Sequence, residues 1–227
     1  MSVRRETDII IPVLTLIAMI AALAAVLLLA PTEKIMGDVQ RIFYFHLACA
    51  AAAFVSFTCV FIASIGFILR RETVWDHLAA SAAEVGVLFT TFVLVTGPLW
   101  ARPVWGQWWV WDPRLTTTLI LWFLYTGYLV LRQSIPGYRG AMAGAVFAIL
   151  AYVDVPVVYF SVSWWRGIHP QVLRGGGGLD PGMVLPLLMS VTAFLLLSGV
   201  LIRERLNIAS AADYVDRIAV ALEDMES

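Results

Sequence analysis

The chain has 227 residues, of which 61% are hydrophobic and 14% are charged, and its mean hydropathy is +0.86. This composition excludes an ordinary soluble domain and predicts an integral membrane protein. The formal net charge of -1 excludes the strongly basic surface that nucleic-acid binding requires, so we expect no nucleic-acid partner.

Six apolar runs are long enough to cross a bilayer, which requires about 20 residues per helix. They cover residues 9–30, 42–69, 79–100, 115–131, 141–162 and 183–203. The first run is too long for a signal-peptide core, so we expect it to remain as the first helix. In the fifth run, Pro156 cannot donate to the carbonyl of Tyr152 and predicts a kink there. The sequence therefore predicts an all-α membrane domain of six transmembrane helices over residues 1–205.

Basic residues at the helix ends predict the orientation of these helices. Eight arginines flank one set of ends, including the doublets Arg4-Arg5 and Arg70-Arg71, and six basic residues flank the other. The excess predicts that both termini are cytoplasmic. Residues 206–227 are predicted to form an amphipathic acidic cytoplasmic tail, and Gly175–Gly178 a flexible linker in an outer loop.

An aromatic stretch separates the third and fourth runs and is predicted to face the outside. It reads Trp105-Gly106-Gln107-Trp108-Trp109-Val110-Trp111-Asp112-Pro113-Arg114-Leu115-Thr116. An interfacial belt would place tryptophans on both faces, yet seven of the nine map outside and only Trp75 clearly maps inside. This asymmetry favours a platform for a large flat ligand, because indoles offer apolar surface with N–H donors at the rim. In a helix, Trp105, Trp108, Trp109 and Asp112 would share one face.

Two of the three histidines, His46 and His169, map to the same outer face, whereas His77 maps to the cytoplasmic side. One histidine near a helix end is usually an interfacial hydrogen-bonding residue. Two beside an aromatic stretch favour a shared ligand, and neutral imidazole is a common axial ligand of haem iron. A copper or zinc site that includes Cys49, three positions after His46, stays an alternative.

Other charged residues have two interpretations each. Arginines at the outer face could form bidentate pairs with haem propionates, or contact lipid headgroups and nearby acids. They are Arg41, Arg102, Arg114 and Arg166. Two acids within the apolar runs, Glu84 and Asp154, could line a pathway or form interhelical hydrogen bonds.

The run from Thr96 to Thr116 resembles the WWD signature of haem-handling proteins, which deliver haem for cytochrome c maturation. With the segments Gln40–His46 and Pro156–His169 and the six helices, the chain is most similar to the CcmC branch, component C of system I. The likeness covers residues from about 38 to about 200. Two departures stand out: Leu47-Ala48 follows His46, where a proline is usual two residues on, and Pro113 replaces a small residue.

This resemblance implies a haem-binding site on the periplasmic face of the bacterial cytoplasmic membrane. His46 and His169 would ligate the iron of non-covalent haem b, and the stretch from Trp105 to Asp112 would contact the porphyrin edge. In the family, haem passes to a membrane-tethered chaperone, component E. The ABC transporter components A and B and the small membrane protein D act with it.

We therefore predict a protein that holds haem at the outer membrane face and delivers it to a haem chaperone. The alternatives are a transporter that passes haem through the bundle and a cytochrome c haem ligase of the same superfamily. No catalytic residue is predicted, and the sequence leaves open whether the chain promotes covalent attachment of haem to the chaperone.

Overall fold

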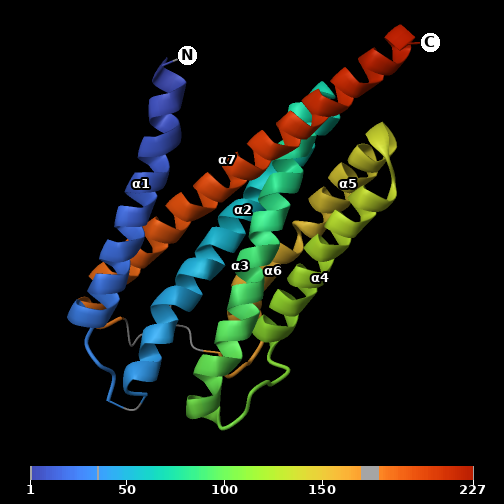
Figure 1. Ribbon diagram of the computed structural model, residues 1–227. Helices are drawn as coiled ribbons and strands as arrows, with labels where there is room; N and C mark the ends of the chain where they lie inside the picture. The colour runs from blue at the N-terminus through green and yellow to red at the C-terminus, as the bar shows by residue number, and fades with distance from the viewer. Residues whose placement is uncertain (1, 35, 170–178, 227) are drawn as a thin grey trace.

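The computed structural model describes residues 2–34, 36–169 and 179–226, so Gly175–Gly178 lie outside the described residues. Within these ranges the chain forms helices and no β-strand, and six helical stretches are long and apolar enough to cross a membrane (Figure 1). They are Asp8–Leu29, Asp38–Arg70, Thr73–Trp105, Pro113–Ser134, Gly137–Trp164 and Pro181–Met225. The predicted all-α membrane fold is confirmed.

Helices α2 (Ile42–Arg70) and α3 (Thr73–Trp105) form the antiparallel centre of the bundle, and a 3₁₀ turn, η2 (Asp38–Arg41), leads into α2. Small residues let the two helices approach closely, as is common where helices pack within membranes. A Cβ atom on Gly66 would lie 2.7 Å from the Trp75 ring, and one on Gly86 would collide with Phe57. The α2–α3 pair is thereby a compact support for side chains at its ends.

Helix α1 (Ser2–Ala24), with the short π-helical turn η1 (Ala25–Leu29), packs against α7 (Pro181–Glu226). Helix α7 crosses the bundle diagonally, contacts α1, α2 and α3, and continues without a break past Arg205 (Figure 1). The predicted tail is therefore a direct extension of the last transmembrane helix.

Helices α4 (Pro113–Ser134) and α5 (Gly137–Ala151) form a hairpin beside the central pair, and α6 (Asp154–Trp164) completes the fifth transmembrane stretch. The helix is interrupted at Tyr152 and Val153, where the carbonyl of Tyr152 accepts from the Val155 N–H at 3.0 Å. The kink predicted from Pro156 is confirmed.

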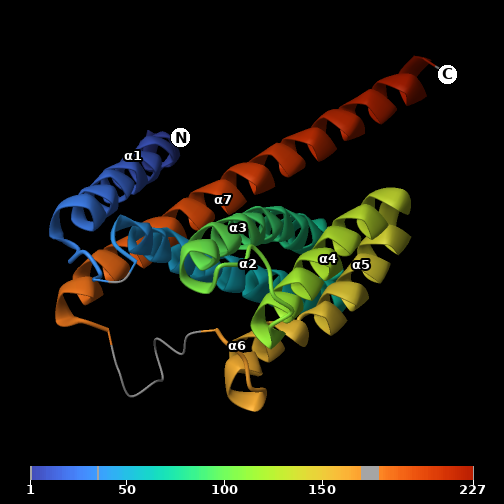
Figure 2. The same cartoon turned by 90° about the horizontal axis from the view of Figure 1, so that it is seen from below.

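The two ends of the bundle differ. The start of α2, the connection 106–112 and the end of α6 lie at one end, here called the loop end, and both chain termini lie at the opposite, terminal end (Figures 1 and 2). At the terminal end α3 is held by ion pairs to its neighbours. Arg132 contacts Asp76 at 2.5 and 3.0 Å, and Arg205 pairs with Glu84. Glu84, a candidate pathway residue, is thus in an interhelical ion pair.

Candidate functional site

A cavity of about 500 Å³ occupies the loop end of the bundle, between α2, α3, α4, α6 and α7. His46 from α2 and His169 from the segment after α6 both line it, although they are far apart in the sequence. His77 lies at the other end of the bundle and contacts Asp213 through Nε2 at 3.2 Å. The fold therefore brings together the two histidines that the sequence predicted to share a ligand.

His46 is held by α3. Its Nδ1 lies 2.9 Å from the Thr96 hydroxyl oxygen, and its ring centroid lies 6.0 Å from that of Trp100. Gly97 leaves room beside the imidazole, since a Cβ atom there would lie 3.4 Å from His46 Cε1. The imidazole is therefore packed against two successive turns of one helix while it lines the cavity.

His169 is held through the residue before it. The backbone N–H of Ile168 donates to Asp112 Oδ2 at 2.8 Å, and the Trp105 ring lies edge-on to the imidazole with centroids 6.4 Å apart. Burial and the positive charge of Arg114 together lower the pKa of His169 to about 4. The imidazole is therefore neutral at physiological pH, which is the form that binds metal.

The tryptophans of the aromatic stretch separate into two groups. Trp105 and Trp109 line the cavity, whereas Trp108 and Trp111 do not and are 51% and 75% exposed. The stretch is not helical, because α3 ends at Trp105 and Gly106 follows in the left-handed conformation with φ 72°. The predicted platform of four tryptophans is therefore divided, with two side chains facing the cavity and two turned toward the surroundings.

Asp112 and Pro113 begin α4. Asp112 is the N-cap residue, with Oδ1 accepting from the Arg114 N–H at 2.9 Å, and Pro113 follows at a position where its missing N–H costs nothing. The second carboxylate oxygen of Asp112 accepts from the backbone N–H of Ile168. Asp112 is buried and does not line the cavity, so both of its oxygens act within the protein. The Pro113 departure from the family pattern is accommodated by this cap.

Of the four outer-face arginines considered for the propionates, Arg114 lines the cavity and Arg41, Arg102 and Arg166 do not. Arg114 also donates to the carbonyl of Tyr159 at 2.8 Å. Arg102 stacks over the Trp108 ring at 4.5 Å. Arg41 donates to the carbonyl of Leu27 at 2.8 Å and pairs with Asp38 at 3.2 Å. The latter two side chains have partners at the loop end but not in the cavity.

Comparison with known proteins decides the family. The model of the CcmC family, described as heme exporter protein C, matches residues 2–217. The chain belongs to the heme exporter protein C family. Over 173 residues it is 38% identical to the heme exporter protein C of Bradyrhizobium diazoefficiens, covering 74% of this chain and 66% of that one.

Two further relatives agree. The heme exporter protein C of Escherichia coli K12 is 34% identical over 179 residues, or 78% of this chain and 73% of that one. A ccmC-like mitochondrial protein of Marchantia polymorpha, described in terms of cytochrome c biosynthesis, is 32% identical over 173 residues, or 75% and 74% of the two chains. Membership in the CcmC family places this membrane protein in haem handling for cytochrome c biogenesis.

The cavity suits the chemistry of the CcmC family's ligand. Haem requires nitrogen ligands for iron, apolar walls for the macrocycle and cationic or hydrogen-bonding groups for the propionates. His46 and His169 supply imidazoles, and Trp105 and Trp109 supply aromatic surface. The Trp109 indole N–H is buried and has no acceptor in the described parts of the chain, so it is available to a ligand.

The alternative small-metal site is less well supported. Cys49 is fully buried in the core and does not line the cavity. Among the residues that the structure describes, no group of three histidine, cysteine or acidic side chains is placed to hold a metal ion. The histidines therefore share a cavity with aromatic side chains and not with a thiol.

Sequence reasoning did not find the inner walls of the cavity in this CcmC-family chain. They are formed by apolar residues of ordinary transmembrane helices, including Phe54, Leu94 and Leu187, and by Trp100.

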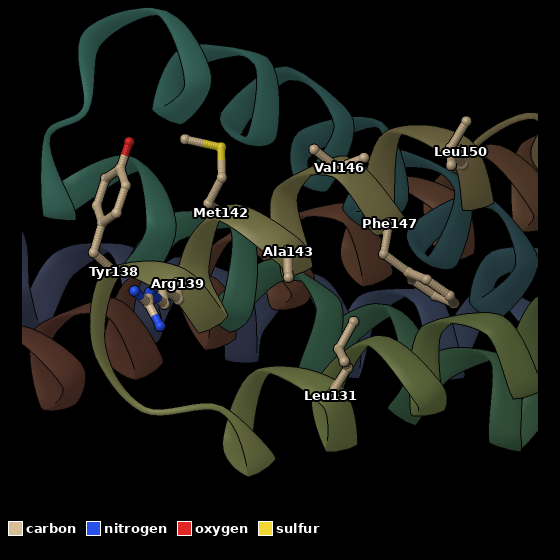
Figure 3. Close-up of a pocket in the computed structure, with 8 residues that line it drawn as sticks. All are labelled: Leu131, Tyr138, Arg139, Met142, Ala143, Val146, Phe147 and Leu150. Atoms are coloured by element: carbon tan, nitrogen blue, oxygen red, sulfur yellow. The ribbon is translucent and has the colours of Figure 1, made fainter.

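A second hollow of about 570 Å³, open and apolar, lies along α4 and α5 at the terminal end (Figure 3). Tyr138 and Arg139 are its polar members, and it lacks histidine and tryptophan.

Proposed function

We propose that this chain holds non-covalent haem b in the loop-end cavity, with the iron between His46 and His169. Trp105 and Trp109 contact the macrocycle, and Arg114 is the cation for a propionate. The observation that carries this proposal is that two histidine side chains from separate segments line one aromatic cavity. Trp108, Trp111 and Arg102 then lie at the rim, where a partner protein would approach.

The loop end is proposed to face the periplasm and the terminal end the cytoplasm. The arginine excess at the terminal end supports this orientation. The membrane would be the bacterial cytoplasmic membrane. In this orientation the haem site is accessible to a periplasmic haem chaperone, component E, and the chain would act with the ABC transporter components A and B and the small protein D.

Binding and release follow from the ligand set. Two histidines would occupy both axial positions of the iron, so bound haem could not bind oxygen without loss of a ligand. Delivery to the chaperone would therefore begin when one imidazole leaves the iron. His169 stands on a connecting segment and His46 within a helix, so the segment 165–169 is the part that can move without disturbing the bundle.

The test is haem binding by the purified protein in detergent. His46→Ala and His169→Ala should each abolish the low-spin Soret spectrum that the wild-type protein shows after haem addition. His77→Ala is the matched control, because His77 lies at the opposite end, paired with Asp213. Wild-type protein that remains colourless with haem, or both cavity variants binding like the wild type, would refute the proposal.

A further inference from the structure

The hydrogen bonds around Thr96 determine which nitrogen of His46 faces a ligand. The Thr96 hydroxyl oxygen lies 2.7 Å from the carbonyl oxygen of Phe92 and 2.9 Å from His46 Nδ1. A carbonyl oxygen can only accept, and a hydroxyl has one hydrogen to donate. The hydroxyl hydrogen therefore goes to Phe92, and Thr96 must accept a hydrogen bond from His46 Nδ1–H.

This arrangement selects one tautomer of His46. A neutral imidazole with its proton on Nδ1 has its lone pair on Nε2. Trp100, one turn further along α3, packs beside the ring, and Gly97 lies next to Cε1. Thr96 belongs to the same α3 surface but is not among the residues that line the cavity.

We infer that Thr96 is a positioning residue for haem: it holds His46 in the Nδ1–H tautomer so that Nε2 is the iron ligand. The inference rests on the proposed function, since it concerns one of the two proposed iron ligands. A metal-bound histidine commonly donates its other N–H to an acceptor, which fixes the ring and makes the ligating nitrogen more basic. Here the acceptor is a threonine hydroxyl on the neighbouring helix.

The effect is specific to one of the two histidines. His169 Nδ1 is buried and has no acceptor in the described ranges 2–34, 36–169 and 179–226. Thr96 should therefore strengthen the bond of iron to His46 and leave His169 unaffected. If iron is bound more strongly by His46 than by His169, release of haem should begin with loss of His169.

Thr96→Val tests this inference, because valine has the shape of threonine without the hydroxyl. We expect haem affinity to fall about 10- to 100-fold, the usual effect of losing such a partner. The midpoint potential of the bound haem should also rise, because a less basic imidazole stabilises ferric iron less. Thr96→Ser should restore both values, since it keeps the hydroxyl.

Thr91→Val is the matched control. Thr91 is on the same helix, donates to the Val87 carbonyl at 2.8 Å and accepts from Trp122 Nε1 at 2.9 Å, so it has the same hydrogen-bonding pattern away from the cavity. This variant should keep the wild-type affinity and potential. If Thr96→Val does not accumulate in membranes, Thr96→Ala removes the hydroxyl with a smaller side chain.

Two results would overturn the inference, and both differ from the result that would refute the proposed function. The first is wild-type affinity and potential in Thr96→Val or Thr96→Ala while His46→Ala loses haem, which refutes Thr96 alone. The second is failure of Thr96→Ser to restore the potential. Retention of haem by both His46→Ala and His169→Ala would instead refute the proposed function.

Discussion

The carboxylate of Asp112 accepts a hydrogen bond from the backbone N–H of Ile168 at 2.8 Å, one residue before His169. The same carboxylate caps α4 through the N–H of Arg114. One side chain thus connects the aromatic stretch, the first turn of α4 and the segment that carries His169. Asp112, at the end of the aromatic stretch, thereby helps to position His169, which belongs to another segment.

Asp112→Asn should lower haem affinity by displacing His169. Arg114 and Ile168 donate to different oxygens of Asp112, and asparagine replaces one of these oxygens with an NH₂ donor. In haem titrations, Asp112→Asn should bind haem more weakly than the wild type, and its bound haem should show less of the low-spin Soret spectrum. Asp180→Asn is the control, since Asp180 makes a similar bond, to the Gly182 N–H at 2.7 Å, at the start of α7. Wild-type affinity and spectrum in Asp112→Asn would contradict this account.

Gly167→Ala should weaken haem binding to a similar extent. A Cβ atom on Gly167 would collide with the Asp112 carboxylate and lie 3.4 Å from Pro113, so the segment before His169 must shift. Gly127→Ala, within α4, has nothing within 4 Å of the added atom and should bind haem normally. Equilibrium haem titration of both variants checks this prediction, and equal affinities would count against the observed packing of residues 165–169.

Substitution of single tryptophans should separate the two groups in the aromatic stretch. Trp109→Leu is expected to reduce haem affinity about 10- to 30-fold, because an aromatic side chain that the ligand covers contributes about 2 kcal/mol to binding. Trp111→Leu should leave the affinity close to that of the wild type, since this side chain is 75% exposed and outside the cavity. Its effect should be on transfer to the chaperone. Equal losses of affinity in the two variants would indicate that both groups of tryptophans contact haem.

Ion pairs at the terminal end should contribute to stability without affecting haem binding. Asp76→Asn breaks the pair with Arg132 and leaves a half-buried guanidinium without its carboxylate. We expect a loss of about 1.5–3 kcal/mol in stability, typical of hydrogen bonds to charged groups. Thermal unfolding in detergent should show a lower Tm, with no change in haem affinity for the remaining folded protein. Arg203→Gln, at the more exposed pair with Asp8, should have a smaller effect.

Much of the fold could be predicted because membrane-spanning helices appear in the sequence as long apolar runs. The six runs, the interruption before Pro156 and the placement of His46 and His169 at one end all follow from residue type and spacing. The helices are longer than predicted, since α3 includes polar residues from Thr73 and continues to Trp105. Hydropathy does not register those turns.

The details of the site could not be predicted, because they depend on local partners. Arg41 is bound to the carbonyl of Leu27, and Arg102 stacks on Trp108; sequence alone shows both as cations at the same interface. The positive φ of Gly106 ends α3 and divides the tryptophans. Thr96 resembles many threonines in membrane helices until its distance from His46 is measured.

The floor of the cavity bears on the route that haem takes. One turn beyond Phe54 and Leu121, which line the cavity, the rings of Phe57 and Tyr125 stack with centroids 3.9 Å apart, and both side chains are fully buried. A porphyrin cannot pass between two rings in van der Waals contact, so this stack closes the path between α2 and α4 toward the terminal end. In the proposed orientation, haem would enter from the periplasmic rim or sideways from the lipid. The step that carries it across the bilayer would then take place outside this bundle.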